Sequence, residues 1–186
     1  MPRLLSVLLL SVALTITAAT ATAGELAGVT MPDTSTVGGA AVSLNGLGLR
    51  KVLFIKVYVI GLYTEKPART EAEALNAGAW KADLHFLRGL EPQKITDGIQ
   101  DGFERNSAAQ IGALQARLDT FKTFFTKVVE GDVAQLAWEP GKGTVVRVNG
   151  SEKGVVPGKD FADALLKVWL GGDPVQEDIK AGMLGG

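Results

Sequence analysis

The chain has 186 residues, and its 19 Lys and Arg nearly balance its 20 Asp and Glu, for a formal net charge of −1. This balance excludes a general attraction to a polyanion such as nucleic acid. Because the chain has no cysteine and a single histidine, His85, disulfides and thiol catalysis are excluded, and no carboxylate arrangement completes a zinc or copper site.

The first 23 residues have the pattern of a secretory signal peptide. A basic residue is followed by an apolar run over residues 4–16 and by an Ala-x-Ala motif at residues 21–23. The run has the length of a cleavable signal and is too short for a lasting membrane span, although an uncleaved anchor is the alternative. We expect cleavage before Gly24, a periplasmic or secreted protein without a permanent membrane anchor, and one domain over residues 24–186.

Strand signals come first in the mature chain. Short candidates at residues 28–31 and 40–44 flank a turn-rich segment. The strongest candidate runs from Lys51 to Tyr63, where apolar residues fill both faces. A strand that is apolar on both faces is central in its sheet and covered on both sides.

The middle of the chain is mainly helical. Thr70 to Glu73 fit a capping box, which predicts a short helix ending near Gly78. A strand over residues 81–87 and a helix over residues 92–106 follow. Ser107 is placed to cap a second helix. The apolar stripe of that helix consists of Ile111, Leu114, Leu118, Phe121 and Phe125. Such stripes pack helices against a sheet.

The last third returns to strands and ends in helices. Residues 133–148 form a predicted hairpin, and the Asn149-Gly150 turn leads into a further strand. Apolar spacing predicts a helix carrying Phe161 to Val168, which is broken at Pro174 before another helix over residues 175–184. This order of elements predicts an α+β fold with a largely antiparallel sheet.

Common catalytic and nucleotide-binding motifs do not occur in the sequence. There is no G-x-S-x-G motif, and His85 has no serine near it in sequence, which favours a structural histidine. Lys142-Gly143-Thr144 lacks the upstream glycines of a phosphate-binding loop, and no glycine run matches the dinucleotide-binding fingerprint. We therefore expect neither a metal nor an organic cofactor.

Two segments carry a family resemblance. Residues 45–63 (NGLGLRKVLFIKVYVIGLY) and residues 158–186 resemble the chalcone isomerase family, most closely its bacterial, secreted branch. The resemblance implies a chalcone isomerase-type α+β fold over nearly all of residues 24–186. In that fold a curved, mainly antiparallel sheet is covered on one face by helices.

The resemblance also indicates which site residues remain. Arg50 matches the arginine that holds the substrate oxyanion in plant chalcone isomerases, a role suited to a forked, permanently charged donor. Tyr58 replaces a catalytic threonine of the family, and Val168 replaces a pocket threonine. The plant enzymes also use a tyrosine and an asparagine from the middle helices. Here those helices have no tyrosine, and Asn106 is the only asparagine near them. Chalcone cyclisation is therefore not the expected activity.

An arginine with a tyrosine resembles the fatty-acid-binding members of the superfamily, in which these side chains hold a carboxylate. We expect a non-catalytic exported protein that binds a small amphipathic acid, such as a fatty acid, in an apolar cleft; no protein partner is indicated. One alternative is an intramolecular lyase or isomerase of a phenolic or conjugated carbonyl substrate, with Arg50 as oxyanion donor and Tyr58 as acid or base. A protein-interaction module without a ligand is another.

The distance between the two candidate residues is a geometric problem. If the strand is unbroken, eight residues at ~3.3 Å separate the Cα atoms of Arg50 and Tyr58 by about 26 Å, too far for one carboxylate. Residues 51–57 contain no Gly, Pro, Asn or Asp that would mark a turn. Either the strand bends sharply near Lys51, or Arg50 only solvates a strand end. Lys56, two residues from Tyr58 on the same face, is a rival cation for the ligand.

Overall fold

The computed structural model describes residues 23–186, so the predicted signal peptide lies outside the described residues apart from its last one. The strands are β1 (Ala23–Leu26), β2 (Val29–Pro32), β3 (Thr34–Val37), β4 (Ala40–Val52), β5 (Ile55–Thr64), β6 (Trp80–Phe86), β7 (Val133–Glu139), β8 (Gly143–Val148) and β9 (Ser151–Val156). The helices are α1 (Glu71–Leu75), α2 (Pro92–Ser107), α3 (Ile111–Lys122), α4 (Lys159–Leu170) and α5 (Glu177–Met183), with a 3₁₀ turn at Ala108–Gln110.

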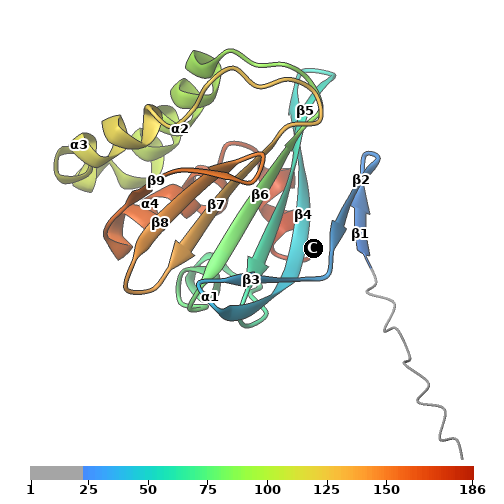
Figure 1. The fold of residues 1–186 in the computed structure, drawn as a ribbon, viewed down its shortest axis with the longest axis horizontal. Coiled ribbons are helices and arrows are strands. Elements are labelled where there is room, and N and C mark those ends of the chain that lie inside the picture. The colour runs from blue at the N-terminus through green and yellow to red at the C-terminus, as the bar shows by residue number, and fades with distance from the viewer. Residues whose placement is uncertain (1–22) are drawn as a thin grey trace, which may run out of the picture.

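Strands β3 to β9 form one antiparallel sheet in which every strand pairs with its neighbours in sequence, and β1 pairs with β2 separately. Figure 1 shows the curved sheet with α2, α3 and α4 gathered on one side of it. The main core lies between the sheet and the helices. On β6, the alternate residues Ala82, Leu84 and Phe86 belong to this core, as the period-two pattern predicts. The predicted α+β architecture is confirmed.

A smaller apolar layer covers part of the opposite face of the sheet. It includes Val37 of β3 and Tyr63 of β5, and β3 crosses in front of the sheet in Figure 1. Met31 of β2 is fully buried, and a Cβ atom on Gly61 would lie 2.3 Å from its sulfur, so the close approach at β5 requires glycine. Residues 59–64 are therefore buried on both faces, as the sequence predicts for a central strand.

The prediction of one continuous strand over residues 51–63 is wrong. The β4 strand ends at Val52, Leu53 and Phe54 form a two-residue turn, and β5 begins at Ile55. Leu53 has a φ of 56°, whereas Phe54 is not among the residues with positive φ. Positive φ at the first loop position alone is the pattern of a type II′ turn, which prefers glycine there. The sequence conceals this turn because it lacks glycine and asparagine.

Of the predicted capping signals, one is confirmed and one is wrong. The hydroxyl of Thr70 accepts a hydrogen bond from the backbone N–H of Glu73 at 3.2 Å, and the Glu73 carboxylate accepts one from the N–H of Thr70 at 3.1 Å. Ser107 ends α2 instead of capping α3, and its buried hydroxyl has no partner within residues 23–186. A 3₁₀ turn follows it, and α3 begins only at Ile111. Helix packing thus overrides the local preference of serine for a cap.

The Asn149-Gly150 turn between β8 and β9 is also confirmed. Its two residues have φ values of 50° and 78°, and positive φ at both positions is typical of a type I′ hairpin turn. The Asn149 side chain accepts a hydrogen bond from the N–H of Val133 at 2.9 Å, which ties the turn to β7. Local turn chemistry therefore fixes this end of the sheet.

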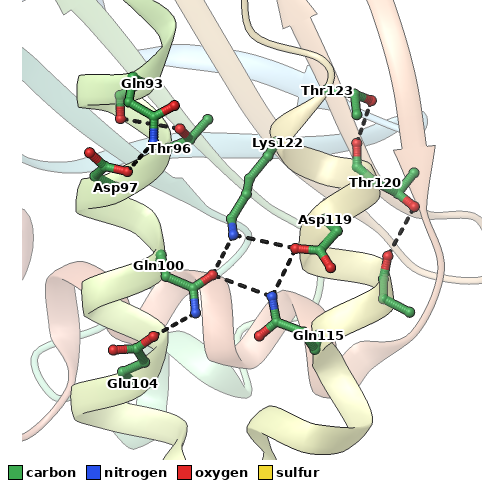
Figure 2. Close-up of polar contacts among 11 residues, drawn as sticks. Gln93, Thr96, Asp97, Gln100, Glu104, Gln115, Asp119, Thr120, Lys122 and Thr123 are labelled. Atoms are coloured by element: carbon green, nitrogen blue, oxygen red, sulfur yellow. Dashed lines mark hydrogen bonds and ion pairs between the residues drawn. The ribbon is translucent and has the colours of Figure 1, made fainter.

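Polar side chains join α2 to α3 on their outer faces, as Figure 2 shows. Lys122 donates to the Gln100 side-chain oxygen and lies 3.4 Å from Asp119. Gln115 donates to Asp119 at 2.8 Å and to Gln100 at 3.4 Å, and Gln100 donates to Glu104 at 2.7 Å. This network holds α2 by its outer face, so its inner face can form one wall of a cavity against the sheet.

Candidate functional site

The β4–β5 hairpin brings Arg50 and Tyr58 together. The two residues are direct Cα partners across the antiparallel pair. Such partners lie ~4.5–5.5 Å apart, not the 26 Å of an unbroken strand. Of the two possibilities left open by the sequence, the structure has the sharp bend, placed at the two-residue turn and not at Lys51 itself.

A β-bulge decides which cation shares a face with Tyr58. Arg50 pairs with Tyr58, but the next pair is Lys51 with Lys56, so Val57 is an extra residue in β5. An extra residue resets the alternation of side chains. Val57 and Tyr58 accordingly both line the cavity described below, whereas Lys56 is exposed and outside its lining. The same-face expectation for Lys56 is therefore wrong.

A cavity of about 440 Å³ lies between the β4–β5 hairpin, the end of β6, α2 and α4. Its volume falls within the range of ~300–1,000 Å³ that is typical of small-molecule sites. Most of its lining is apolar and consists of Val52, Ile55, Val57, Leu84, Phe86, Leu90, Ile95, Ile99, Val168, Trp169 and Val175. The lining residues with polar or charged side chains are Arg50, Tyr58, Arg88, Glu91 and Lys94. Such a surface suits a ligand that is mainly apolar with one polar end.

The Arg50 guanidinium is positioned by neutral oxygens. It donates to the carbonyl of Lys51 at 3.0 Å, and to the carbonyl of Val175 and the side-chain oxygen of Gln176 at 3.4 Å each. The Gln176 side chain in turn accepts from the N–H of Lys51 at 3.1 Å and donates to the carbonyl of Leu49 at 3.4 Å. Gln176 thus holds this end of β4 by two backbone hydrogen bonds and orients the Arg50 guanidinium.

No carboxylate within residues 23–186 forms an ion pair with Arg50. Asp101 and Asp173 border a second, more polar depression that Arg50 also lines, but Asp173 lies 3.7 Å from Arg105 instead. A guanidinium at the wall of an apolar cavity without an acidic partner favours an anionic ligand.

Tyr58 presents a neutral hydroxyl to the same cavity. The indole N–H of Trp169 donates to the Tyr58 oxygen at 3.0 Å. Burial raises the pKa of Tyr58 above its usual value of 10.0, although the Trp169 hydrogen bond and the charge of Arg50 oppose that shift. Because the oxygen already accepts from Trp169, the hydroxyl hydrogen remains available to a ligand oxygen. Arg50 and Tyr58 together therefore offer donors to one acceptor group.

Helix α4 closes the inner wall of the cavity. Val168, predicted as the replacement of a pocket threonine, lines the cavity and is buried. Its helix packs closely on α2, since a Cβ atom on Gly102 would lie 2.7 Å from a Val168 methyl group. Valine at this position makes this part of the wall apolar.

Asn106 lies in the last turn of α2 and is not part of the cavity lining. Its side chain donates to the carbonyls of Asp173 at 2.7 Å and Gly102 at 3.1 Å, and accepts from the N–H of Asp173 at 2.9 Å. All these partners are backbone groups. Asn106 therefore holds the loop between α4 and α5 in place and has no free donor for a ligand.

His85 also lies outside the cavity lining. It alternates with Leu84 and Phe86 along β6, so its side chain is on the face of the sheet opposite to the helices. Burial lowers the pKa of His85 below its usual value of 6.5, with the Asp83 carboxylate opposing the shift. Within residues 23–186, no cluster of three or more His, Cys, Asp or Glu residues could hold a metal ion. No helix in that range is long and apolar enough to cross a bilayer.

Residues 23–185 match the family of chalcone isomerase-like proteins. This chain belongs to the chalcone isomerase-like family. The crystal structure of a fatty-acid binding protein from Arabidopsis thaliana is similar, with a TM-score of 0.70 and 18% sequence identity over 88% of this chain and 96% of that chain. At this identity the likeness establishes the fold. No curated protein sequence matches the chain.

Two residues of this chalcone isomerase-like site carry no clear signal in the sequence. Trp169 follows Val168 in an apolar helix and is typical of core packing, and only its contact with Tyr58 shows its role. Gln176 lies in the break between α4 and α5, more than a hundred residues from the strand it holds. Neither contact follows from local pattern, because both depend on the tertiary arrangement.

Proposed function

We propose that this chalcone isomerase-like protein binds a small amphipathic acid, such as a fatty acid, without catalysing a reaction on it. The proposal depends chiefly on the Arg50–Tyr58 pair beside an otherwise apolar cavity. Guanidinium N–H groups and the phenol O–H can satisfy both oxygens of a carboxylate. Each acyl methylene buried along the wall contributes ~0.8 kcal/mol. The similar Arabidopsis protein is named as fatty-acid binding, which supports the choice of ligand class.

The lyase or isomerase alternative receives less support from this geometry. A general base must lose its proton near the working pH, but burial raises the pKa of Tyr58 above 10.0. The other acidic residue of the lining, Glu91, lies 2.7 Å from Lys127 in an exposed ion pair. The site is therefore richer in donors than in bases, which suits the binding of an anion.

We further propose that the protein is exported in the manner of the bacterial, secreted branch of the family. The signal-peptide pattern of residues 1–23 supports this. The intact mass of the protein recovered from the periplasm tests it directly: the mass of residues 24–186 is expected. A chain that remains in the cytoplasm with its first 23 residues attached would contradict export.

The binding proposal is tested with a fatty acid and a fatty alcohol of the same chain length, each titrated below its micelle concentration. The wild-type protein is expected to prefer the acid. Arg50→Gln and Tyr58→Phe should each weaken acid binding by roughly tenfold to a hundredfold, because a hydrogen bond to a charged group contributes ~1.5–3 kcal/mol. Binding of the alcohol should change far less. Lys153→Gln, which removes an exposed charge in β9, is the matched control.

Stability must be measured alongside affinity for Tyr58→Phe. That substitution leaves the Trp169 N–H without its partner, at a cost of ~1–3 kcal/mol in unfolding free energy. Thermal unfolding of each variant shows that the folded state persists at the assay temperature. The proposal fails if wild type binds no acid, or if both folded variants bind the acid as tightly as wild type.

A further inference from the structure

Four of the five large apolar side chains exposed within residues 23–186 lie at the tip of the β4–β5 hairpin. Leu53 and Phe54 are 86% and 87% exposed, and Val52 and Ile55 are 50% and 39% exposed. In Figure 1 this tip stands at the upper end of the sheet. Leu53 and Phe54 are almost fully exposed within residues 23–186, so their hydrophobicity does not serve the core.

The backbone of the tip gives a second observation. Leu53 adopts a φ of 56°, a conformation that is strained for a residue with a Cβ atom and that glycine adopts freely. Folding alone therefore favours glycine at this position. The leucine costs stability in the isolated protein and buries nothing there, which indicates a role in contact with something outside the chain.

Charge supplies the third observation. Lys51 and Lys56 flank the tip and are direct partners across the hairpin, an arrangement of like charges that destabilises a strand pair. Arg88 and Lys94 line the cavity beside the tip. None of these four has an ion-pair partner within residues 23–186. In a chain of net charge −1, this basic ring around an apolar tip is complementary to an anionic surface.

One of the acidic residues at this end of the molecule, Glu91, is already paired with a base. Glu91 lies 2.7 Å from Lys127, so that pair is neutral.

The loop after α3 presents Val129, which is 54% exposed, followed by Glu130. Val128 bridges Leu90 of the cavity lining, which places this loop at the same end of the sheet as the tip. Val129 thus extends the apolar surface beside the cavity.

We propose that the hairpin tip, residues 51–56, docks on an anionic phospholipid bilayer. Leu53 and Phe54 enter the boundary between headgroups and acyl chains, and Lys51 and Lys56 contact the lipid phosphates. Val52 and Ile55 belong both to the tip and to the cavity lining, so docking places the cavity against the bilayer. An acyl chain then passes between cavity and membrane without crossing water; this last step rests on the proposed function, whereas the docking does not.

The test uses the chain from Gly24, which contains the described sheet and helices and lacks the apolar run of residues 4–16 that would bind lipid by itself. Sedimentation with phosphatidylcholine vesicles is measured with and without phosphatidylglycerol. Wild type is expected to bind the anionic vesicles, and less tightly as salt is raised. Phe54→Ser should lower the partition coefficient about tenfold. The pair Lys51→Gln and Lys56→Gln should lower it about thirtyfold.

Leu53→Gly separates docking from folding. It relieves the left-handed strain, so its melting temperature should equal or exceed that of wild type while vesicle binding falls. Lys66→Gln with Lys153→Gln removes the same charge at exposed positions outside the tip and should leave vesicle binding unchanged. The proposal is overturned if wild type ignores anionic vesicles, if the folded tip variants bind like wild type, or if the tip proves to hold two copies of the chain together in sedimentation velocity.

Failure of docking and failure of ligand binding are distinguishable. Fatty-acid affinity is measured in solution without vesicles, where the tip variants should match wild type because Leu53 and Phe54 are outside the cavity lining. Intact docking without any affinity for acids would refute the proposed function alone. Intact affinity without docking would refute the inference alone.

Discussion

Gly98 offers a way to fill the cavity without disturbing the fold. It lies in the interior of α2 and lines the cavity, and a Cβ atom built on it would meet no atom within 4 Å. A leucine at this position therefore projects into open space without displacing the core. We predict that Gly98→Leu weakens ligand binding and stabilises the protein at the same time.

Both magnitudes follow from the structure. Glycine in a helix interior costs ~0.5–1 kcal/mol relative to a good helix former, so the free energy of unfolding should rise by about that amount. In the cavity, the leucine side chain takes the place of about four ligand methylenes at ~0.8 kcal/mol each. The loss of about 3 kcal/mol corresponds to an affinity roughly a hundredfold weaker.

Gly112 provides the matched control. It lies in α3, is exposed, is outside the cavity lining, and likewise has nothing within 4 Å of a Cβ position. Gly112→Leu should bring a smaller gain in helix propensity, because Gly112 is the second residue of α3, and should leave ligand affinity unchanged. Isothermal titration with a fatty acid and urea unfolding, carried out on both variants, give the two quantities separately.

The refuting result is equally specific. If Gly98→Leu is at least as stable as wild type and binds the acid with wild-type affinity, the ligand does not occupy this cavity. If both glycine variants lose affinity to the same extent, the loss comes from the helices in general and not from the filled space. Either result would remove the basis for placing the acyl chain between α2 and the hairpin.

Three further predictions concern titration and buried charge. His85 is the single histidine, so its NMR titration is unambiguous and should give a pKa below 6.5, because burial disfavours the imidazolium. The unfolded state then binds the proton more readily, so the free energy of unfolding should decrease as the pH falls below ~6.5, and His85→Gln should flatten that decrease; a pKa at or above 6.5 would contradict this. Lys81 lies 2.7 Å from Asp83, with both side chains less than a tenth exposed, so Lys81→Met should lower the unfolding free energy in urea by ~3–5 kcal/mol. Adding Asp83→Leu should recover most of that loss, and no recovery would show that the pair is not what stabilises this site. Because the pKa of Tyr58 is raised above 10.0, acid affinity should be the same at pH 7 and pH 9, and a marked loss by pH 9 would indicate an ionised phenol.

Local chemistry determined much of the fold. The Thr70 capping box, the Asn149-Gly150 turn and the period-two pattern of β6 each depend on residues close in sequence, and each has the predicted structure. The resemblance at residues 45–63 and 158–186 pointed to the α+β fold of the family, and the residues that line the cavity include Arg50, Tyr58 and Val168 among those predicted.

The tertiary structure alone decided how these residues meet. The turn at Leu53-Phe54 has no turn-forming residue, so local preference argues against it, and it forms because β4 and β5 gain a long ladder and share the smaller apolar layer. The bulge at Val57 places Lys56 on the face opposite to Tyr58. The alternation of residues within one strand cannot reveal such a bulge, because a bulge is defined by the pairing of two strands. Strand register and the approach of distant helices depend on contacts far apart in sequence, which is why the sequence could indicate candidate residues but not the cavity that Arg50 and Tyr58 share.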